Sequence, residues 1–337
     1  MKAFFKFIFV LLLFCIIISG SAFYWFNKPT GHISAYGDEF EIIKGDNAYS
    51  VSNRLYMRGF INSKELFVII ARVLKLDNDL KTGWVRFKPE SATLDIVKTV
   101  YGGEFISVNF TIPEGSTVNQ IKDILVKSDI VSKESIDDFL SDPDYTAKIG
   151  LDGYKSAEGF LFPDTYKFYK GVSVEKIFAS MVDLFFEKLS GIYPNYKKLD
   201  RKTLYDKIIL ASIVEKEVRI PNELPVVSGV FYNRIKSGMR IQSCATVQYI
   251  LGKPKEHLLE TDLQIINPYN TYIFAGLPPT PIASPGYNAI NAAFFPAKHD
   301  YKFFVVKDPD KGSHYFSKTY DEHLRAQQRY KSIKGFY

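Results

Sequence analysis

The 337-residue sequence has few cysteines and histidines and lacks several common catalytic motifs. Its two cysteines are Cys15 and Cys244, and because Cys15 lies in a long apolar run, a disulfide framework is excluded while the redox compartment stays undecided. None of the five histidines lies in an HExxH or similar spacing, so we expect neither a metal nor a cofactor. The absence of GxSxG, P-loop and GxGxxG motifs argues against hydrolases and nucleotide-binding classes that depend on them. Cys244 has no nearby histidine, which favours a small buried thiol over a nucleophile.

Positive and negative charges nearly balance, with 43 Lys and Arg against 37 Asp and Glu and a net charge of +6. The excess is spread along the chain without a dense basic block, so we expect no nucleic-acid partner. Hydrophobic residues at 46% and charged residues at 24% are typical of a folded protein. The 22 tyrosines and 28 phenylalanines suit a large core and suit stacking on sugar rings equally well.

The N-terminus carries an apolar run without a charge from residue 7 to residue 26, which is long enough to span a bilayer as a helix. Lys2 and Lys6 precede it, so residues 1–6 are expected to be a cytoplasmic tail, and Tyr24 and Trp25 suit the far membrane interface. The alternative is a signal peptide cleaved near residues 20–22, which are small. Both interpretations place the rest of the chain outside the cytoplasm.

Two stretches, residues 40–67 and 110–136, share a pattern at an offset of about 70 residues. Each predicts a strand, a glycine turn, an amphipathic helix and a second helix capped by a serine. Residues 84–89 alternate like a strand that closes the first copy. We therefore expect a linker and a small α+β module over residues 27–102, and a larger α+β domain over residues 103–337.

The stretch ASIVEKE, residues 211–217, brings two glutamates to the end of an apolar helix that begins near Lys202. At about 100° per residue, Glu215 and Glu217 lie roughly 200° apart, so one can face a site while the other faces elsewhere. A carboxyl group among apolar neighbours has a raised pKa, which suits a general acid at neutral pH. Periodicity does not choose between the two glutamates, and taken alone it favours a salt-bridged or solvated glutamate at a helix end over a catalytic one.

The C-terminal third alternates short helices with turn-forming segments. A helix is expected over residues 226–237 and another over residues 317–335. The intervening residues are rich in Pro, Gly, Asn and Tyr, which predicts loops and short strands that shape a groove.

Several long motifs in this region resemble those of the endolytic murein transglycosylases of the YceG-like family. The matching segments lie in the same order as in that family, between about residue 155 and residue 325, and they are EGFLFPDTY, ASIVEKE, VFYNRIKSGMRIQSCATVQYILG, INPYNTYIFAGLPPTPIASPG, PAKHDYKFFVV and GSHYFSKTYDEH. The apolar N-terminus also agrees, and the small module is similar to the LysM-like module of this family, which implies either glycan binding or a structural spacer.

The resemblance implies a lytic cut in peptidoglycan by one glutamate, which falls on Glu217. This residue would protonate the oxygen between N-acetylmuramic acid and N-acetylglucosamine. It would then act as the base while the muramyl C6 hydroxyl closes onto C1, leaving a 1,6-anhydro end. Glu215 would support the helix. The implied partners are nascent glycan strands, the cytoplasmic membrane and cell-wall synthases, and the implied role is to terminate strand elongation from the outer side of the cell (inner) membrane.

The resemblance also implies polar and aromatic contacts to the saccharide. The expected substrate-binding residues are Asn233, Arg234, Gln242, Ser243, Thr246, Tyr249, Asn270, Tyr272 and Glu158. Many relatives carry an acidic residue and a proline after the Gln-Ser pair, and Cys244 and Ala245 stand there in this sequence. A role for that acidic side chain is therefore in doubt, although we expect activity to survive.

Two other functions remain open at this point. A muramidase would use water, with Glu158 or Asp164 as the second carboxylate. A non-catalytic scaffold would bind glycan and position cell-wall synthesis proteins, and the intact E-K-E triplet argues against it.

Overall fold

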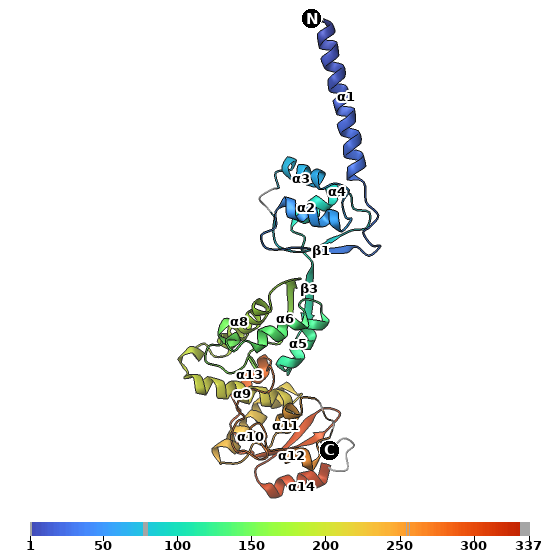
Figure 1. The fold of residues 1–337 in the computed structure, drawn as a ribbon. Coiled ribbons are helices and arrows are strands. Elements are labelled where there is room, and N and C mark those ends of the chain that lie inside the picture. Colours follow the sequence, from blue (N-terminus) through green and yellow to red (C-terminus); the bar gives the residue numbers. More distant parts are fainter. Residues whose placement is uncertain (1, 77–79, 254, 256, 331–337) are drawn as a thin grey trace. The chain divides into compact units, whose positions relative to one another are not determined.

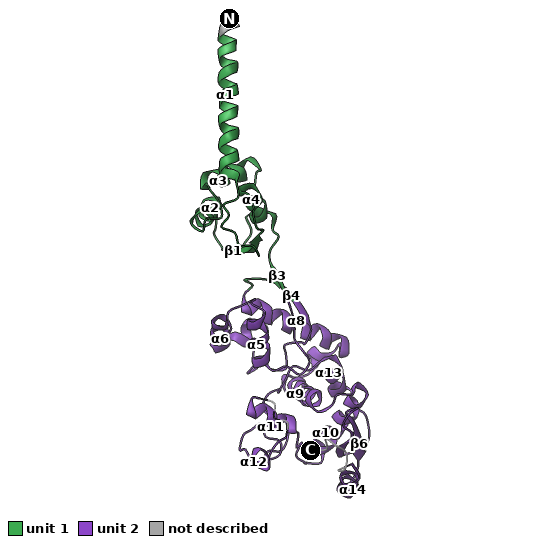
Figure 2. Cartoon of the chain, turned by 90° about the vertical axis from the view of Figure 1, so that its right-hand side faces the viewer, with its two compact units in different colours: residues 1–108, 167–172 green, residues 109–166, 173–337 purple. Residues whose placement is uncertain are grey.

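The computed structural model describes residues 2–76, 80–253, 255 and 257–330 and has a mixed α+β fold, as predicted (Figure 1). The chain forms two compact units (Figure 2). Unit 1 comprises residues 1–108 and 167–172, and unit 2 comprises residues 109–166 and 173–337.

Unit 1 begins with the long apolar helix α1 and continues as a small module. Its elements are α1 (Lys2–Asn27), β1 (Asp38–Ile42), α2 (Ala48–Met57), α3 (Lys64–Val73), β2 (Gly83–Phe87) and α4 (Thr93–Gly102). Within α1, the stretch Phe4–Asn27 is long and apolar enough to cross a membrane, and its side chains are exposed. Helix α1 runs without a break through the small residues 20–22.

The module of unit 1 has the predicted order of strand, two helices and closing strand. Strands β1 and β2 pair antiparallel, with Phe40 opposite Val85. Asn47 caps α2 and Ser63 caps α3, each through a side-chain oxygen that accepts backbone N–H groups. The buried core lies between this two-stranded sheet and the helices. Within it, the ring centroids of Phe40 and Phe87 are 5.8 Å apart.

The second copy of the repeat closes in the same way, but its closing strand lies much further along the chain. Strand β3 (Ser107–Thr111) pairs with β4 (Thr165–Tyr169), and helices α5 (Val118–Lys127) and α6 (Lys133–Ser141) lie between them in sequence. The Ile112 N–H donates to the Asp164 carbonyl at 2.9 Å, and the Lys170 N–H donates to the Ile106 carbonyl at 2.8 Å. Since residue numbers fall on one strand as they rise on the other, the pair is antiparallel.

Unit 2 is mainly helical and carries one further hairpin. Its remaining elements are α7 (Tyr145–Lys148), α8 (Val174–Ile192), η1 (Tyr196–Lys198), α9 (Arg201–Glu217), η2 (Pro221–Glu223), α10 (Leu224–Lys236), α11 (Cys244–Leu251), α12 (Glu260–Leu263), α13 (Tyr287–Phe294), β5 (Phe303–Asp308), β6 (Ser313–Ser317) and α14 (Tyr320–Tyr330). The helices predicted over ASIVEKE and over residues 226–237 are confirmed as α9 and α10. The predicted C-terminal helix is α14, and residues 331–335 of that prediction lie outside the described residues.

Helix α9 is the central element of unit 2. It packs against α10, α11 and α13, and all seven residues from Ile208 to Val214 are buried (Figure 2). This half of α9 is therefore covered by neighbours on all sides and shows no single apolar stripe. The charged residues at its end begin where α9 leaves this core.

Gly229 on α10 provides a test of how tightly this helix packs against the loop that follows α13. A β-carbon at Gly229 would lie 2.5 Å from the Ala297 carbonyl oxygen and 2.6 Å from Nε2 of His299, whereas one at Gly191 on α8 would meet nothing within 4 Å. We expect Gly229→Ala to lower the free energy of unfolding by about 1–3 kcal/mol through overpacking. The matched control, Gly191→Ala, should raise it by up to about 1 kcal/mol through helix propensity. Urea unfolding measures both, and equal effects of the two substitutions would contradict this packing.

Candidate active site

The end of α9 presents three charged side chains at the surface of the unit 2 core. Glu215 and Glu217 are partly exposed and Lys216 is exposed. The chain then leaves the helix at Val218 in an extended conformation, with φ −130° and ψ 132°, before Pro221 begins η2. Each of the three side chains consequently has different neighbours.

Glu215 and Lys216 fasten the end of α9 to two loops. The Gly286 N–H donates to Oε2 of Glu215 at 2.9 Å, and Nζ of Lys216 donates to the Gly115 carbonyl at 3.1 Å. The loops are joined to each other, because the Gly115 N–H donates to the Ser284 carbonyl at 2.8 Å. Burial raises the pKa of Glu215, against the opposing effect of the Gly286 N–H. Both side chains therefore have structural partners.

Glu217 points to the N-terminus of α11 instead. Its Oε1 accepts a hydrogen bond from Oγ of Ser243, the residue that precedes α11, and the backbone N–H of Ala245 is a further hydrogen-bond donor to the carboxyl group. The first N–H groups of a helix attract negative charge, so this position stabilises the carboxylate form. Burial acts in the opposite direction and is the largest effect, so the pKa of Glu217 is raised.

Arg234 and His314 also act on Glu217 without forming an ion pair with it in the described part of the chain. Arg234 and His314 both lower the pKa of Glu217, by less than burial raises it. Arg234 is buried, and its guanidinium donates to the carbonyls of Lys302 and Ile241, both at 2.6 Å. Nδ1 of His314 lies 2.7 Å from Oε2 of Glu223, which also accepts the His314 N–H through Oε1 at 3.1 Å. Both side chains are thus held by other groups.

Ser243 is itself held by a buried threonine pair. Its N–H donates to Oγ1 of Thr271 at 3.0 Å, and Oγ1 of Thr271 lies 2.9 Å from Oγ1 of Thr246. The preceding residue, Gln242, is exposed and has a φ of +54°, a conformation that a non-glycine residue adopts only when its surroundings impose it. These contacts fix the direction in which the Ser243 hydroxyl meets Glu217.

Asn233 and Asn270, both predicted to bind substrate, are engaged with the backbone. Nδ2 of Asn233 donates to the carbonyls of His299 at 2.8 Å and Tyr301 at 2.9 Å. Asn270 is fully buried, and its Nδ2 donates to the carbonyls of Leu263 at 3.0 Å and Ile265 at 2.8 Å. The structure therefore gives both amides a part in holding the loops around the site.

Tyr272 and Cys244 lie together beside Glu217. Sγ of Cys244 is 3.0 Å from the Tyr272 hydroxyl, and both groups interact electrostatically with Glu217. The prediction that Cys244 is buried is wrong, because its side chain is exposed at the first position of α11. The thiol thus occupies the surface position for which an acidic residue was expected. Arg240 donates to the Tyr272 carbonyl at 3.1 Å and is exposed.

Glu158 and Tyr249 form a separate group. The Tyr249 hydroxyl donates to Oε2 of Glu158 at 3.4 Å, and the Val118 N–H at the start of α5 donates to the same carboxyl at 3.2 and 3.3 Å. Glu158 is buried, and this burial raises its pKa to about 7 against the two hydrogen bonds. Among the predicted site residues, Glu217, Arg234, Gln242, Ser243, Thr246 and Tyr272 therefore come together, whereas Glu158 and Tyr249 contact each other.

Sequence reasoning missed Thr271 and Glu223. Thr271 stands between two predicted residues in NPYNTY, and only the pairing of that loop with α11 reveals its contact to Ser243. Glu223 lies in a proline-rich turn, and its hydrogen bond to His314 joins residues 91 positions apart. No local pattern signals contacts of this kind.

The comparisons with known proteins agree with this architecture. The site is a carboxyl group at the end of one helix that contacts the N-terminus of another helix in a mixed α+β domain, and residues 40–329 match the model of the YceG-like family. The chain belongs to the YceG-like family, as its sequence motifs predicted.

Three relatives illustrate the similarity. A Bacillus subtilis (strain 168) protein named endolytic murein transglycosylase is 31% identical over 257 residues, which cover 71% of this chain and 70% of that protein. A protein of the same name from Streptococcus pneumoniae serotype 2 is 28% identical over 314 residues, covering 84% of this chain but 56% of the relative. The chain thus spans just over half of the streptococcal relative. A crystal structure of a YceG-like protein from Listeria monocytogenes matches with a TM-score of 0.58 and 30% identity, covering 87% of this chain and 99% of that one.

The raised pKa of Glu158 predicts a pH-dependent stability. The ordinary value is 4.5 and the folded value about 7, so the stability linked to this proton is present below pH 4.5 and is lost as the pH rises through 7. Glu158→Gln cannot titrate. We therefore expect the difference in free energy of unfolding between the variant and the parent to shift in favour of the variant by about 2–3 kcal/mol between pH 5 and pH 8. Urea unfolding at the two pH values measures this, with Glu187→Gln as an exposed control, and a pH-independent difference for Glu158→Gln would contradict it.

Proposed function

We propose that this protein is a membrane-anchored endolytic lytic transglycosylase that cleaves the bond between N-acetylmuramic acid and N-acetylglucosamine in nascent peptidoglycan strands. The observation that carries the proposal is the position of Glu217, a carboxyl group with a raised pKa at the N-terminus of α11, free of an ion pair in the described part of the chain. The names of the relatives from Bacillus subtilis and Streptococcus pneumoniae support the same reaction.

In the first step, Glu217 acts as the general acid. Its raised pKa keeps the proton on the carboxyl group at a pH where an ordinary glutamate has lost it. The proton passes to the glycosidic oxygen, the bond from that oxygen to muramyl C1 breaks, and N-acetylglucosamine leaves with the new hydroxyl group. The carboxylate that remains is stabilised by the Ser243 hydroxyl and the N-terminus of α11.

In the second step, the Glu217 carboxylate is the base. It removes the proton of the muramyl C6 hydroxyl while the C6 oxygen bonds to C1, which gives the 1,6-anhydro end and restores the neutral acid. The attacking oxygen belongs to the substrate, so neither water nor a second protein carboxylate is consumed. Glu158, whose partners are Val118 and Tyr249, is accordingly given a structural part.

The remaining site residues divide into those that face solvent and those that hold the frame. Gln242 and Cys244 are exposed and Tyr272 is partly exposed, so these three side chains are the proposed saccharide contacts next to Glu217. The other group makes buried hydrogen bonds or hydrogen bonds to the backbone, which fix the position of Ser243 and of the surrounding loops. These frame residues are Asn233, Arg234, Thr246, Asn270 and Thr271.

Helix α1 is the proposed membrane anchor, with residues 1–6 in the cytoplasm and unit 2 on the outer side of the cell membrane. Hydrogen bonds between the end of α1 and the module support an anchor: the Thr93 hydroxyl donates to the Phe26 carbonyl at 3.0 Å, and the Leu94 N–H donates to Oδ1 of Asn27 at 2.9 Å. We further propose that the module is LysM-like, and that the enzyme terminates strand elongation beside the cell-wall synthases.

Glu217→Gln is the first test of the assignment. We expect at least about a 100-fold loss of strand cleavage, since an amide donates no catalytic proton, together with near-normal unfolding. Glu215→Gln is the matched control two residues away: its amide oxygen still accepts the Gly286 N–H, so most activity should remain. Equal cleavage by the parent and Glu217→Gln would refute the role of Glu217, and binding without cleavage by the parent would favour the scaffold.

Product analysis separates lytic cleavage from hydrolysis. We expect mass spectrometry of peptidoglycan strands digested by the full-length protein to find fragments that end in anhydromuramyl groups and arise from cuts at internal positions of the strands. Reducing muramyl ends would instead identify a water-using muramidase with a second carboxylate.

Ser243→Ala tests how the site sets the acidity of Glu217. The Ser243 hydroxyl lowers the pKa of Glu217, so its removal should raise that pKa further and move the alkaline limb of the kcat/KM profile to higher pH. The rate at the optimum should fall, because the carboxylate loses a hydrogen-bond donor. Ser237→Ala, at an exposed serine that ends α10, is the control. An unchanged profile in Ser243→Ala would show that the hydroxyl does not act on the catalytic proton.

A further inference from the structure

Helix α3 of unit 1 has apolar side chains on the side that faces away from the core. Phe67, Ile70 and Ala71 are buried in the module, as expected for an amphipathic helix. On the other side, Ile69, Val73 and Leu74 are 55%, 73% and 43% exposed. We call Leu66, Ile69, Val73 and Leu74 the α3 outer face. A helix that is apolar on both sides normally has a cover on each.

The α3 outer face is continuous with the end of α1. An apolar hollow of about 310 Å³ is lined by Phe23 of α1 together with the α3 outer face, Ile70 and Leu94. Phe23 lies four residues before the end of α1, a rise of about 6 Å along the helix. Both views place α3 at the α1 side of unit 1 and β1 on the far side (Figures 1 and 2).

The connection between α1 and the module is fixed by hydrogen bonds. Besides the contacts of Phe26 and Asn27 to α4, Nδ2 of Asn62, just before α3, donates to the Lys28 carbonyl at 2.7 Å. Trp25 is exposed with Nζ of Lys28 lying 3.8 Å from its ring, a combination typical of a membrane interface. A membrane that contains α1 therefore reaches its interface at the level of α3.

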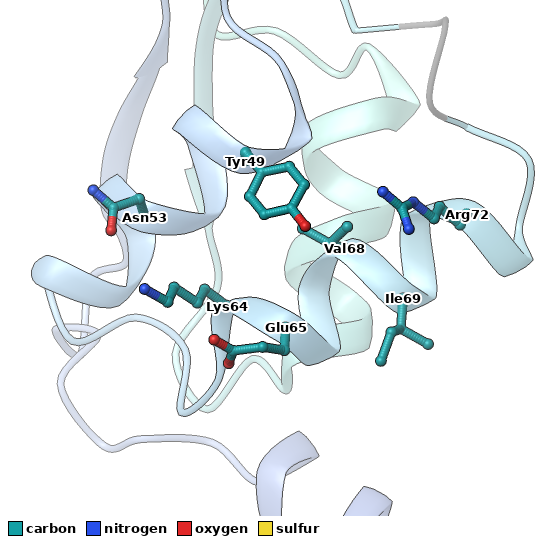
Figure 3. Close-up of a pocket in the computed structure, with 7 residues that line it drawn as sticks. All are labelled: Tyr49, Asn53, Lys64, Glu65, Val68, Ile69 and Arg72. Atoms are coloured by element: carbon teal, nitrogen blue, oxygen red, sulfur yellow. The ribbon is translucent and has the colours of Figure 1, made fainter.

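Basic side chains border the α3 outer face. A second hollow, of about 390 Å³, shares Ile69 with the first (Figure 3). Its other lining residues are Val68 and five polar ones, two of them basic and one acidic: Tyr49, Asn53, Lys64, Glu65 and Arg72. Figure 3 shows Tyr49 and Arg72 on one side of α3, while Ile69 points away from them. Within the described residues, neither Lys64 nor Arg72 forms an ion pair. Apolar groups beside unpaired cations are the composition that anionic lipid surfaces attract.

We propose that the α3 outer face, with Lys64 and Arg72, is a docking surface for anionic phospholipids of the outer leaflet. This rests on the proposed anchoring of α1 in that membrane. Acyl chains contact Phe23, Ile69 and Val73, and lipid phosphates meet the two cations. The module is thereby held flat against the membrane instead of swinging at the end of α1.

Depth-dependent fluorescence quenching in the full-length protein tests this surface. Three single-cysteine proteins are labelled and reconstituted in vesicles that contain brominated acyl chains and phosphatidylglycerol: Cys244→Ser, which keeps the native Cys15 in α1, and Val73→Cys and Lys88→Cys in a Cys15→Ser, Cys244→Ser background. Lys88 is exposed and directly follows β2, the strand that pairs with β1. We expect labels at residues 15 and 73 to lose most of their fluorescence and the label at residue 88 to keep it.

The outcomes separate this inference from the proposed anchoring. If residue 15 is quenched while residue 73 behaves like residue 88, the docking surface is overturned and the anchor stands. If residue 15 is not quenched, the anchor fails and the docking surface fails with it. Lys64→Glu with Arg72→Glu should reduce quenching at residue 73 but not at residue 15, whereas the control pair Lys44→Glu with Lys88→Glu should change neither. Unchanged quenching at residue 73 in the first pair would overturn the part assigned to the two cations.

Discussion

The contact between Glu217 and the N-terminus of α11 is the interaction on which the proposed chemistry depends. A helix that is buried on all sides carries its last residue to a boundary where burial and solvent meet. Burial favours the neutral carboxyl, while the Ser243 hydroxyl and the Ala245 N–H favour the charged one. A group that must first give and then take a proton needs both forms to be accessible. The two opposed effects meet that requirement at a single side chain.

Several polar side chains in unit 2 hold the structural elements that surround Glu217. Glu215 and Lys216 hold the end of α9 to two loops, so the direction of the next side chain is set. The buried threonine pair holds Ser243, and the backbone-directed bonds of Asn233, Arg234 and Asn270 hold the surrounding loops. These buried polar groups are satisfied by hydrogen bonds, which makes them a rigid support for the few exposed side chains.

The sequence predicted much of the fold and part of the site. The boundaries of α9 and α10, the strand-helix-helix order of both repeats, the closing strand of the first repeat and the long apolar helix follow from periodicity, caps and turns, which are local signals. The closing strand of the second repeat, β4, did not follow from them. The sequence grouped Glu158 with Glu217 in one site, but in the structure Glu158 contacts Val118 of α5 and Tyr249. These partners lie 40 and 91 positions away in the sequence, so no local pattern indicates them. Cys244 was expected to be buried, and its exposure is decided by how α11 lies against the loop that carries Tyr272.

By itself the sequence determined the elements, the family and a pair of glutamates at one helix end. Periodicity could not choose between Glu215 and Glu217, since a rotation of roughly 200° says only that they face different ways, and the family resemblance pointed to Glu217. Tertiary structure gave the two carboxyl groups different surroundings by bringing the N-terminus of α13 to Glu215 and the N-terminus of α11 to Glu217. The reason is physical: the surroundings of a side chain, and with them its pKa, are set by residues distant in sequence that only the folded chain brings near.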